Sequence, residues 1–343
     1  MPALTGLVAS AHAAGEPALE RRVLGTDDPT EVASVIEAFV DRRLGPVADA
    51  LFYRRSVGIV AGLRLGDGSQ VVLKVHHWNA AAPRLAPVHQ VQRELAGRGL
   101  PAPRPLVGPE PLGRGMATVE ELVAGGRPEG PGPVVRRSLA RGLSAFVDAA
   151  APLVGRAPVG GPLMLREPGA PLWFEPHDVR FDFGATGTGA EWIDQLATQA
   201  RRRLEPAGSD LVIGHFDWRV ENLGFRGAEI VAIYDWDAVC AAPEPVVVGN
   251  AAAQFTADWT SGGADPLPTV DEMRAFVADY ESARGRSFST AERQVLDAAN
   301  LSACAYGARC AHSDMVLRPE ILDGAQPGWI RLLHERGSRA LLD

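Results

Sequence analysis

The sequence predicts an α+β fold, in which strands dominate the first third of the chain and helices the remainder. Residues 57–65 and 70–75 are rich in strand-forming side chains and flank the turn 66–69, a pattern typical of a β-hairpin. Further along the chain, most segments instead repeat apolar residues at the helical spacing of three and four. A second short hairpin, predicted between residues 223 and 234, interrupts these helices and carries polar residues at both ends.

The composition indicates a globular protein of one large or two modest domains, since 46% of its 343 residues are apolar and 22% are charged. A net charge of -8 argues against a nucleic-acid partner. No segment approaches the roughly 18 apolar residues of a membrane span, the N-terminus lacks the basic start of a signal peptide, and the three cysteines have no metal-site spacing. We therefore expect a cytoplasmic monomer or homodimer without a nucleic-acid or membrane partner.

The other elements follow from local patterns along the chain. A helix is expected from Pro29 to Leu44, because proline is favoured at the first helical position and a glycine follows the last. An apolar strand over residues 116–123 runs into the glycine-rich segment 124–126, which indicates the link between two lobes. Further helices are expected at residues 88–95, 134–150, 191–204, 271–283, 290–306 and 329–342.

Lysine usage is the sharpest feature of the composition, because the chain has 33 arginines and a single lysine, Lys74. Such a bias is typical of a GC-rich genome, in which arginine replaces lysine wherever either serves. Lys74 lies within the apolar strand 70–75, where an ammonium is costly unless it reaches a partner. A compact ammonium suits a place among phosphate oxygens better than a planar guanidinium does. The alternative is that one lysine remains by chance.

The segment 211–237 contains the motif His-x-Asp-x4-Asn at residues 215–222, followed by the second hairpin and Asp235. Folding that hairpin brings Asn222 and Asp235 together beside Asp217. Transfer of a phosphoryl group from a nucleotide needs such a set, with one group to accept the hydroxyl proton and two hard oxygen donors for magnesium. Taken singly, each residue could equally be a turn or capping residue. A metal-dependent hydrolase would need several histidine ligands, and only His215 is near.

Together these features resemble the aminoglycoside phosphotransferase and choline kinase group of small-molecule kinases. The likeness spans most of the chain and rests on residues 71–75, 99–103, 120–125, 215–222, 233–236 and 279–285.

The resemblance implies a bilobal, protein-kinase-like fold. Residues 1–122 would form a small, β-rich, nucleotide-binding N-terminal lobe, and residues 123–343 a larger, mostly helical lobe for catalysis and substrate binding. The expected cofactors are ATP (or GTP) and Mg²⁺.

The resemblance also assigns roles to residues. Asp217 would be the catalytic base and His215 a structural organiser of its loop. Magnesium would be bound by Asn222 and Asp235. The expected nucleotide contacts are Lys74, as the phosphate anchor, with Ser56, Glu121 and Val123.

One departure from the family pattern concerns the partner of Lys74. The helix glutamate that normally pairs with this lysine is expected where the chain has Val88. Gln92 lies on the same face of the predicted helix and is therefore the candidate partner.

The function implied by the resemblance is transfer of the γ-phosphate of ATP to a hydroxyl of a small molecule. We expect an antibiotic as acceptor, in resistance or self-resistance, and candidate substrate contacts are Trp218, Asp258 and Trp259. The alternatives are a metabolite kinase acting on choline, a sugar or an amino-alcohol, and a nucleotide-binding pseudokinase without turnover. The complete set of Lys74 and the loop residues argues against the last.

Overall fold

The computed structural model describes residues 2–13, 18–55, 57–76, 82–128, 130, 132–159, 170–178, 180–204, 210–258, 267–319 and 328–342. By their contacts the residues fall into two compact units, Met1–Ala124 and Gly125–Asp343. The boundary expected after residue 122 lies close to this division.

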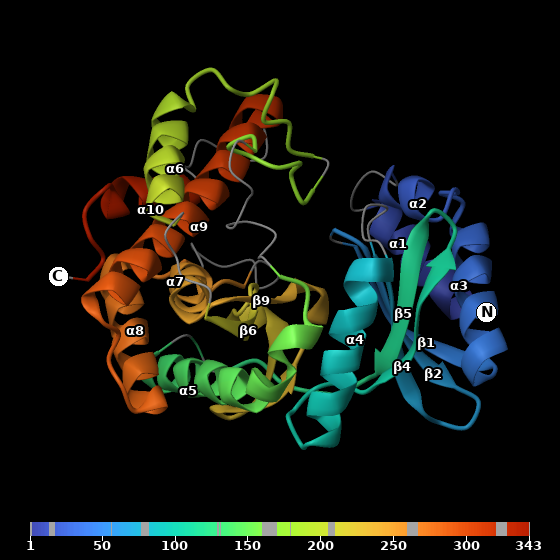
Figure 1. Ribbon diagram of the computed structural model, residues 1–343. Coiled ribbons are helices and arrows are strands. Elements are labelled where there is room, and N and C mark those ends of the chain that lie inside the picture. Colours follow the sequence, from blue (N-terminus) through green and yellow to red (C-terminus); the bar gives the residue numbers. More distant parts are fainter. Residues whose placement is uncertain are drawn as a thin grey trace. The chain divides into compact units, whose positions relative to one another are not determined.

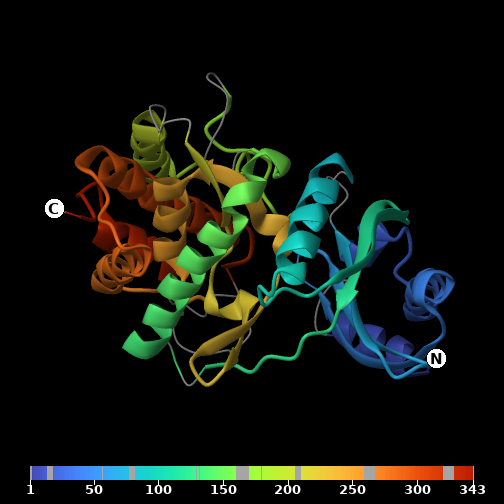
Figure 2. The same cartoon turned by 60° about the horizontal axis from the view of Figure 1, so that its bottom comes forward.

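The first unit is built on one antiparallel sheet of five strands in the order β1-β2-β3-β5-β4. Helices α1, α2 and α3 cover one face of this sheet, and α4 lies on the other (Figures 1 and 2). The strands are β1 (Val47–Arg55), β2 (Ile59–Leu65), β3 (Gln70–His76), β4 (Pro105–Leu112) and β5 (Gly115–Glu121). The helices are α1 (Pro2–Ala13), α2 (Ala18–Val23), α3 (Pro29–Leu44) and α4 (Ala82–Gly97).

Alternation along β3 separates the two faces of the sheet. Val71, Leu73 and Val75 are buried in a core shared with the helices α1 and α3. Because successive side chains of a strand point to opposite faces, Lys74 lies on the face that α4 covers. The helix α3 has the predicted bounds, and the Asp28 side chain caps its first turn by accepting hydrogen bonds from the N–H groups of Thr30 and Glu31.

The second unit is mostly helical. Its two small sheets each pair two strands, β6 with β9 and β7 with β8, and both pairs are antiparallel. The helices are α5 (Pro133–Ala150), α6 (Glu191–Leu204), α7 (Glu244–Gln254), α8 (Val270–Arg284), α9 (Thr290–Leu317) and α10 (Gly328–Arg336). The strands are β6 (Leu211–His215), β7 (Leu223–Arg226), β8 (Glu229–Ile233) and β9 (Val239–Pro243).

The predicted α+β fold, with a β-rich N-terminal lobe and a larger helical lobe, is confirmed. The helices α1, α2 and α7 and the strand β9 are among the elements that were not predicted. Every residue of β9 is buried, and so are residues 245–253 of α7. A helix without a polar face shows no amphipathic period, so the pattern that reveals surface helices is missing there. The helix α9 also continues to Leu317, well beyond the predicted end at residue 306.

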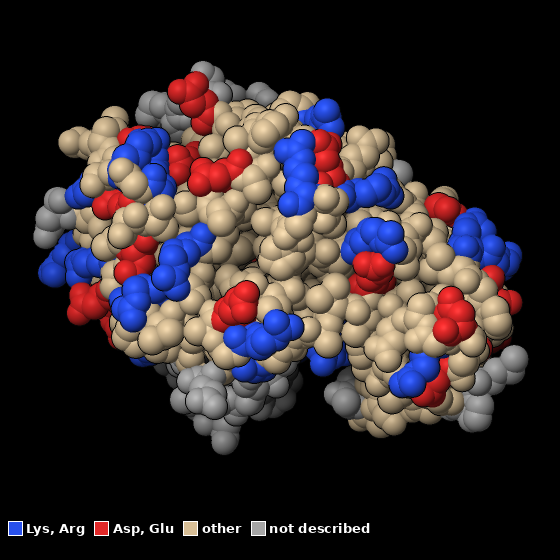
Figure 3. Space-filling model, turned by 90° about the horizontal axis from the view of Figure 1, so that it is seen from below, with Lys and Arg blue, Asp and Glu red and all other residues tan. Residues whose placement is uncertain are grey.

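Acidic and basic side chains are mixed on the face shown in Figure 3, and neither sign forms a continuous area there. In the described part of the chain, no helix combines the length and the apolar character that crossing a bilayer requires.

Candidate active site

His215 ends the strand β6 and anchors the loop that follows. Its side chain is fully buried, its Nε2 lies 2.7 Å from the carbonyl oxygen of Tyr234, and its Nδ1 accepts the backbone N–H of Asp217 at 3.2 Å. An imidazole that accepts at Nδ1 carries its proton at Nε2, so the ring is neutral and donates to Tyr234. Burial lowers the pKa of His215, against the opposing effect of the Tyr234 hydrogen bond and nearby carboxylates. The ring therefore fastens the start of the loop to the end of β8.

Two donors hold the Asp217 carboxylate. Asn222 Nδ2 donates to Asp217 Oδ2 at 2.6 Å, and Arg219 Nη1 contacts Asp217 Oδ1 at 3.0 Å. The same amide nitrogen of Asn222 donates to the Asp217 carbonyl oxygen at 2.9 Å, which fixes the orientation of the amide. The Asp217 side chain keeps 27% of its surface exposed, so a ligand can reach the oriented carboxylate.

The hairpin β7–β8 brings the expected metal ligands to one end. Leu223 pairs with Ile233, and the N–H of Tyr234 donates to the Asn222 carbonyl oxygen at 2.9 Å. Asp235 follows directly with φ 54°, a left-handed conformation that aspartate and asparagine adopt more readily than most residues. The carboxylates of Asp217 and Asp235 both act on the buried His215 ring. The structure thus gathers the predicted loop residues into one cluster.

The donor set of this cluster suits a magnesium ion. The Asn222 amide nitrogen is used by Asp217, and within the described residues its Oδ1 accepts no hydrogen bond. An amide oxygen and the Asp235 carboxylate are hard donors, and Mg²⁺ is usually bound by one or two carboxylates together with phosphates and waters. No group of three or more His, Cys, Asp or Glu side chains that could hold a metal occurs among the described residues.

Arg219 is a feature of the loop that the sequence reasoning missed. Besides its contact with Asp217, its Nε lies 3.5 Å from Glu221 Oε2. Its position two residues after the expected base was the available signal, because a long side chain at that spacing in a short loop can reach the base. The guanidinium places a positive charge beside the Asp217 carboxylate.

His177 was also missed. Its backbone N–H donates to the Tyr306 hydroxyl at 3.2 Å, and its Nδ1 lies 2.6 Å from the same oxygen. The Tyr306 hydroxyl thus contacts both the backbone and one ring nitrogen of His177. Burial of the ring against its neighbours lowers the pKa of His177, although part of the side chain is exposed. Asp217 and Arg219 are among the charges that act on the ring. His177 is therefore a fixed polar group near the loop.

The carboxylate that contacts Lys74 belongs to Glu120 of β5, and the prediction of Gln92 as the partner needs correction. Lys74 Nζ lies 3.0 Å from Glu120 Oε1. Gln92 donates to the other oxygen of that carboxylate at 2.9 Å. The reason is the sheet order, because β5 lies beside β3 and places Thr118 opposite Lys74, with Glu120 on the same face.

Two predicted contacts fall outside the described residues, namely Ser56 and Trp259. Glu121 ends β5, where its N–H donates to the Arg104 carbonyl oxygen at 3.0 Å and its carboxylate pairs with the Arg104 side chain at 2.6 Å. Val123 follows two residues later. Their expected contacts with a nucleotide stay predictions.

Trp218 is a core residue and has no surface to offer a substrate. It is 0% exposed, and its indole N–H donates to the Leu139 carbonyl oxygen at 3.0 Å. Its place in the motif suggested a contact, but the side chain points into the helical core, where Phe146 packs against it. Asp258 forms an ion pair with Arg127 at 2.9 Å, and its contact with a substrate stays a prediction.

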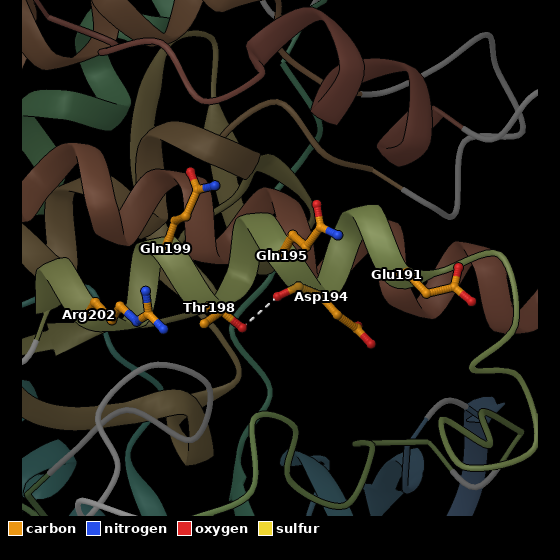
Figure 4. A pocket seen from close by; sticks show the side chains of 6 residues that line it. All are labelled: Glu191, Asp194, Gln195, Thr198, Gln199 and Arg202. Carbon is orange, nitrogen blue, oxygen red and sulfur yellow. Dashed lines mark hydrogen bonds between the residues drawn. The ribbon is translucent and has the colours of Figure 1, made fainter.

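A polar hollow lies along α6 and contains none of the predicted site residues. Figure 4 shows that its lining side chains all come from this one helix. They are Glu191, Asp194, Gln195, Thr198, Gln199 and Arg202.

The sequence was compared with models of protein families, and one family matches. The model of the phosphotransferase enzyme family covers residues 62–285, which is more than half of the 343 residues. The chain belongs to the phosphotransferase enzyme family. The predicted kinase-type phosphotransferase is thereby confirmed, and the matched region includes Lys74 and the whole loop from His215 to Asp235.

Solved structures with the same fold are members of related kinase groups. Amicoumacin kinase hAmiN, solved in complex with AMP-PNP, Ca²⁺ and Ami, is 12% identical with a TM-score of 0.58, covering 82% of this chain and 88% of that one. A thermostable mutant of the aminoglycoside phosphotransferase APH(4)-Ia, solved with ADP and hygromycin B, is 17% identical with a TM-score of 0.55, covering 89% and 99%. An aminoglycoside-3'-phosphotransferase of type VIII is 19% identical with a TM-score of 0.50, covering 80% and 98%. At these identities the likeness establishes the fold. None of the curated proteins matches the sequence.

Proposed function

We propose that this phosphotransferase moves the γ-phosphate of ATP to a hydroxyl of a small molecule. The observation that carries the proposal is the Asp217 carboxylate, held by Asn222 and Arg219 and partly open to solvent. A carboxylate in that setting can accept a proton from an alcohol, which is the task of the base in phosphoryl transfer.

In the proposed reaction Asp217 orients the acceptor hydroxyl and takes its proton as the oxygen forms a bond to the γ-phosphorus. The bond between that phosphorus and the bridging oxygen of the β-phosphate breaks, and ADP leaves. Arg219 lies beside the base and stabilises negative charge on the transferred group. His215 and Asn222 keep the loop and the carboxylate in place.

The nucleotide would be held by its phosphates. Lys74 would contact phosphate oxygens, and Ser56, Glu121 and Val123 would complete the nucleotide contacts. Asn222 and Asp235 would bind Mg²⁺, which would neutralise negative charge on the phosphates. The complexes of related folds with AMP-PNP and Ca²⁺, and with ADP, support a nucleotide and a divalent cation. GTP is the alternative nucleotide.

The acceptor is proposed to be a hydroxylated antibiotic, because two of the similar structures hold amicoumacin and hygromycin B. Asp258 and Trp259 are the proposed acceptor contacts. His177 is added to them, because its ring is a polar group close enough to Asp217 for that charge to act on it. We infer further that the protein acts in the cytoplasm as a monomer or homodimer, in a resistance or self-resistance role.

Labelled ATP with Mg²⁺ and a panel of acceptors tests this proposal. The panel contains aminoglycosides including hygromycin B, macrolides, peptide and nucleoside antibiotics, choline and sugars. We expect transfer to at least one antibiotic, and much slower transfer by the Asp217→Asn variant. Transfer to choline or a sugar alone would replace the antibiotic by a metabolite. Binding of ATP without transfer to any acceptor or to water would contradict the enzymatic role.

A further inference from the structure

A group of polar side chains lies under α4, on one face of the five-stranded sheet. Besides Lys74 and Glu120 it contains Gln92 and His89 of α4. On the same face, the Thr118 hydroxyl and His76 Nε2 form a hydrogen bond of 2.9 Å. Burying a polar side chain costs free energy unless it has a partner, so the presence of several buried polar side chains at one place needs an explanation.

The register of the sheet fixes the ion pair. In the antiparallel pair β3–β5, Lys74 is opposite Thr118 and Val72 is opposite Glu120. The ammonium and the carboxylate are thus diagonal neighbours on one face, and they meet at 3.0 Å with 12% and 7% of their side chains exposed. Both members belong to the same sheet, so forming the pair requires no movement of a helix and no ligand.

Gln92 fixes the carboxylate from the other side. Its Nε2 donates to Glu120 Oε2 at 2.9 Å and to the Pro103 carbonyl oxygen at 2.8 Å, and the residue is fully buried. Both partners are acceptors, so turning the amide over would place its oxygen against two oxygens. The amide orientation is therefore determined, and Glu120 is held between one donor from α4 and the ammonium from β3.

We propose that Glu120 and Gln92 are positioning residues that hold the Lys74 ammonium for the phosphates of the nucleotide. The counter-ion is carried by the strand next to the lysine, and α4 contributes a neutral amide in place of a charge. This inference rests on the proposed role of Lys74 as phosphate anchor. It also gives a reason for the single lysine, because a planar guanidinium would not meet Glu120 with the geometry of a compact ammonium.

The single lysine makes the proposal directly measurable. In protein labelled with ¹³C only in lysine, the side-chain signal of Lys74 stands alone, and its titration can be followed by NMR in the absence of nucleotide. We expect the wild-type signal to stay in its charged form up to the alkaline limit of the folded protein. In Glu120→Gln the titration midpoint should fall by about one pH unit or more, since an opposite charge at this range is worth about that much. Gln92→Met, which leaves the carboxylate in place but unanchored, should lower it less.

Glu110→Gln is the matched control, because Glu110 lies in the same sheet and forms an exposed ion pair with Arg43. It should leave the titration of Lys74 unchanged. Titration of MgATP binding then separates the pairing of Lys74 with Glu120 from the positioning of Lys74 for the nucleotide. We expect Glu120→Gln to weaken MgATP binding about tenfold and Gln92→Met to weaken it by a smaller factor, while Glu110→Gln binds as wild type does.

An unchanged Lys74 titration in Glu120→Gln would overturn the pairing itself. A shifted titration with unaltered MgATP affinity would overturn the positioning role, and if Lys74→Met also bound MgATP normally, the proposed function of Lys74 would fail as well. Should Glu120→Gln not fold, Gln92→Met gives the same test, because a titration and an affinity that both equal those of wild type would contradict the proposal.

Discussion

The Lys74 network and the loop around Asp217 hold a charged group in different ways. Asp217 is held within a loop of a few residues, by a neighbour two positions on and another five positions on, and its carboxylate is partly exposed. Lys74 is held across two strands and a helix, and its ammonium is largely buried. The loop keeps the Asp217 carboxylate accessible, as a base needs, whereas the sheet holds the Lys74 ammonium in a fixed position and direction. Changes at Asp217 should therefore act on turnover, and changes at Lys74 and its partners on nucleotide affinity.

The largest effect is expected from Asp217→Asn. This variant should bind MgATP as wild type does but lower kcat by roughly 10²- to 10⁴-fold, because a positioned base contributes about that much. Steady-state kinetics and a binding titration measure both quantities. Asp271→Asn is a suitable control, since the Asp271 side chain is 91% exposed on α8. Turnover near the wild-type rate would remove Asp217 from its role and with it the distinction between the two regions.

Lys74→Arg is expected to have the next largest effect, and it separates charge from shape. The variant keeps the charge but replaces a compact ammonium by a planar group, so kcat/KM for ATP should fall roughly tenfold, or about 1.4 kcal/mol. The melting temperature should change little. Arg64→Lys, on the exposed side of the adjacent strand β2, is the matched exchange in the other direction and should be neutral. Full activity of Lys74→Arg would mean that the single lysine is an accident of composition.

A third prediction concerns the dependence of stability on pH in the sheet region and leaves turnover aside. Burial lowers the pKa of His89 to about 4, against the opposing effect of Glu120. The unfolded chain, with a histidine pKa near 6.5, then binds more protons than the folded chain between pH 6.5 and 4. The free energy of unfolding should therefore fall as the pH falls through this window, by up to about 3 kcal/mol from this residue. Urea unfolding at pH 7, 6 and 5 should show a weaker pH dependence for His89→Gln than for wild type. Equal slopes would show that His89 is not the titrating group.

The two regions also differ in how far the sequence could predict them. The loop contacts join residues close in the chain, such as Asn222 with Asp217, and the hairpin follows from strand-forming residues around a turn. The nearness of Asn222 to Asp217 was therefore accessible from spacing alone. Glu120 is 46 positions from Lys74, and no periodicity reveals that β5 inserts beside β3. The sheet order decides the partner, and sheet order is a property of tertiary packing.

The same reasoning explains the other differences. Trp218 looked like a possible contact because it directly follows Asp217 in the motif, but the short loop turns its ring into the core. The fully buried helix α7 lacks a polar face, and so the sequence offered no helical period for it. Predictions failed where burial or packing between distant segments decides the outcome.

The central claim is that the loop after β6 binds a divalent cation together with a nucleotide through Asp235. Calorimetric titration with ATP, in the presence and absence of Mg²⁺, tests it in the variant Asp235→Asn. Asparagine suits the left-handed backbone at this position, so the change removes charge without adding strain. Asp237→Asn, an exposed carboxylate in the same turn, is the control. We predict that Mg²⁺ tightens ATP binding in wild type and in Asp237→Asn, but gives no gain in Asp235→Asn. An equal gain from Mg²⁺ in all three proteins would contradict the account.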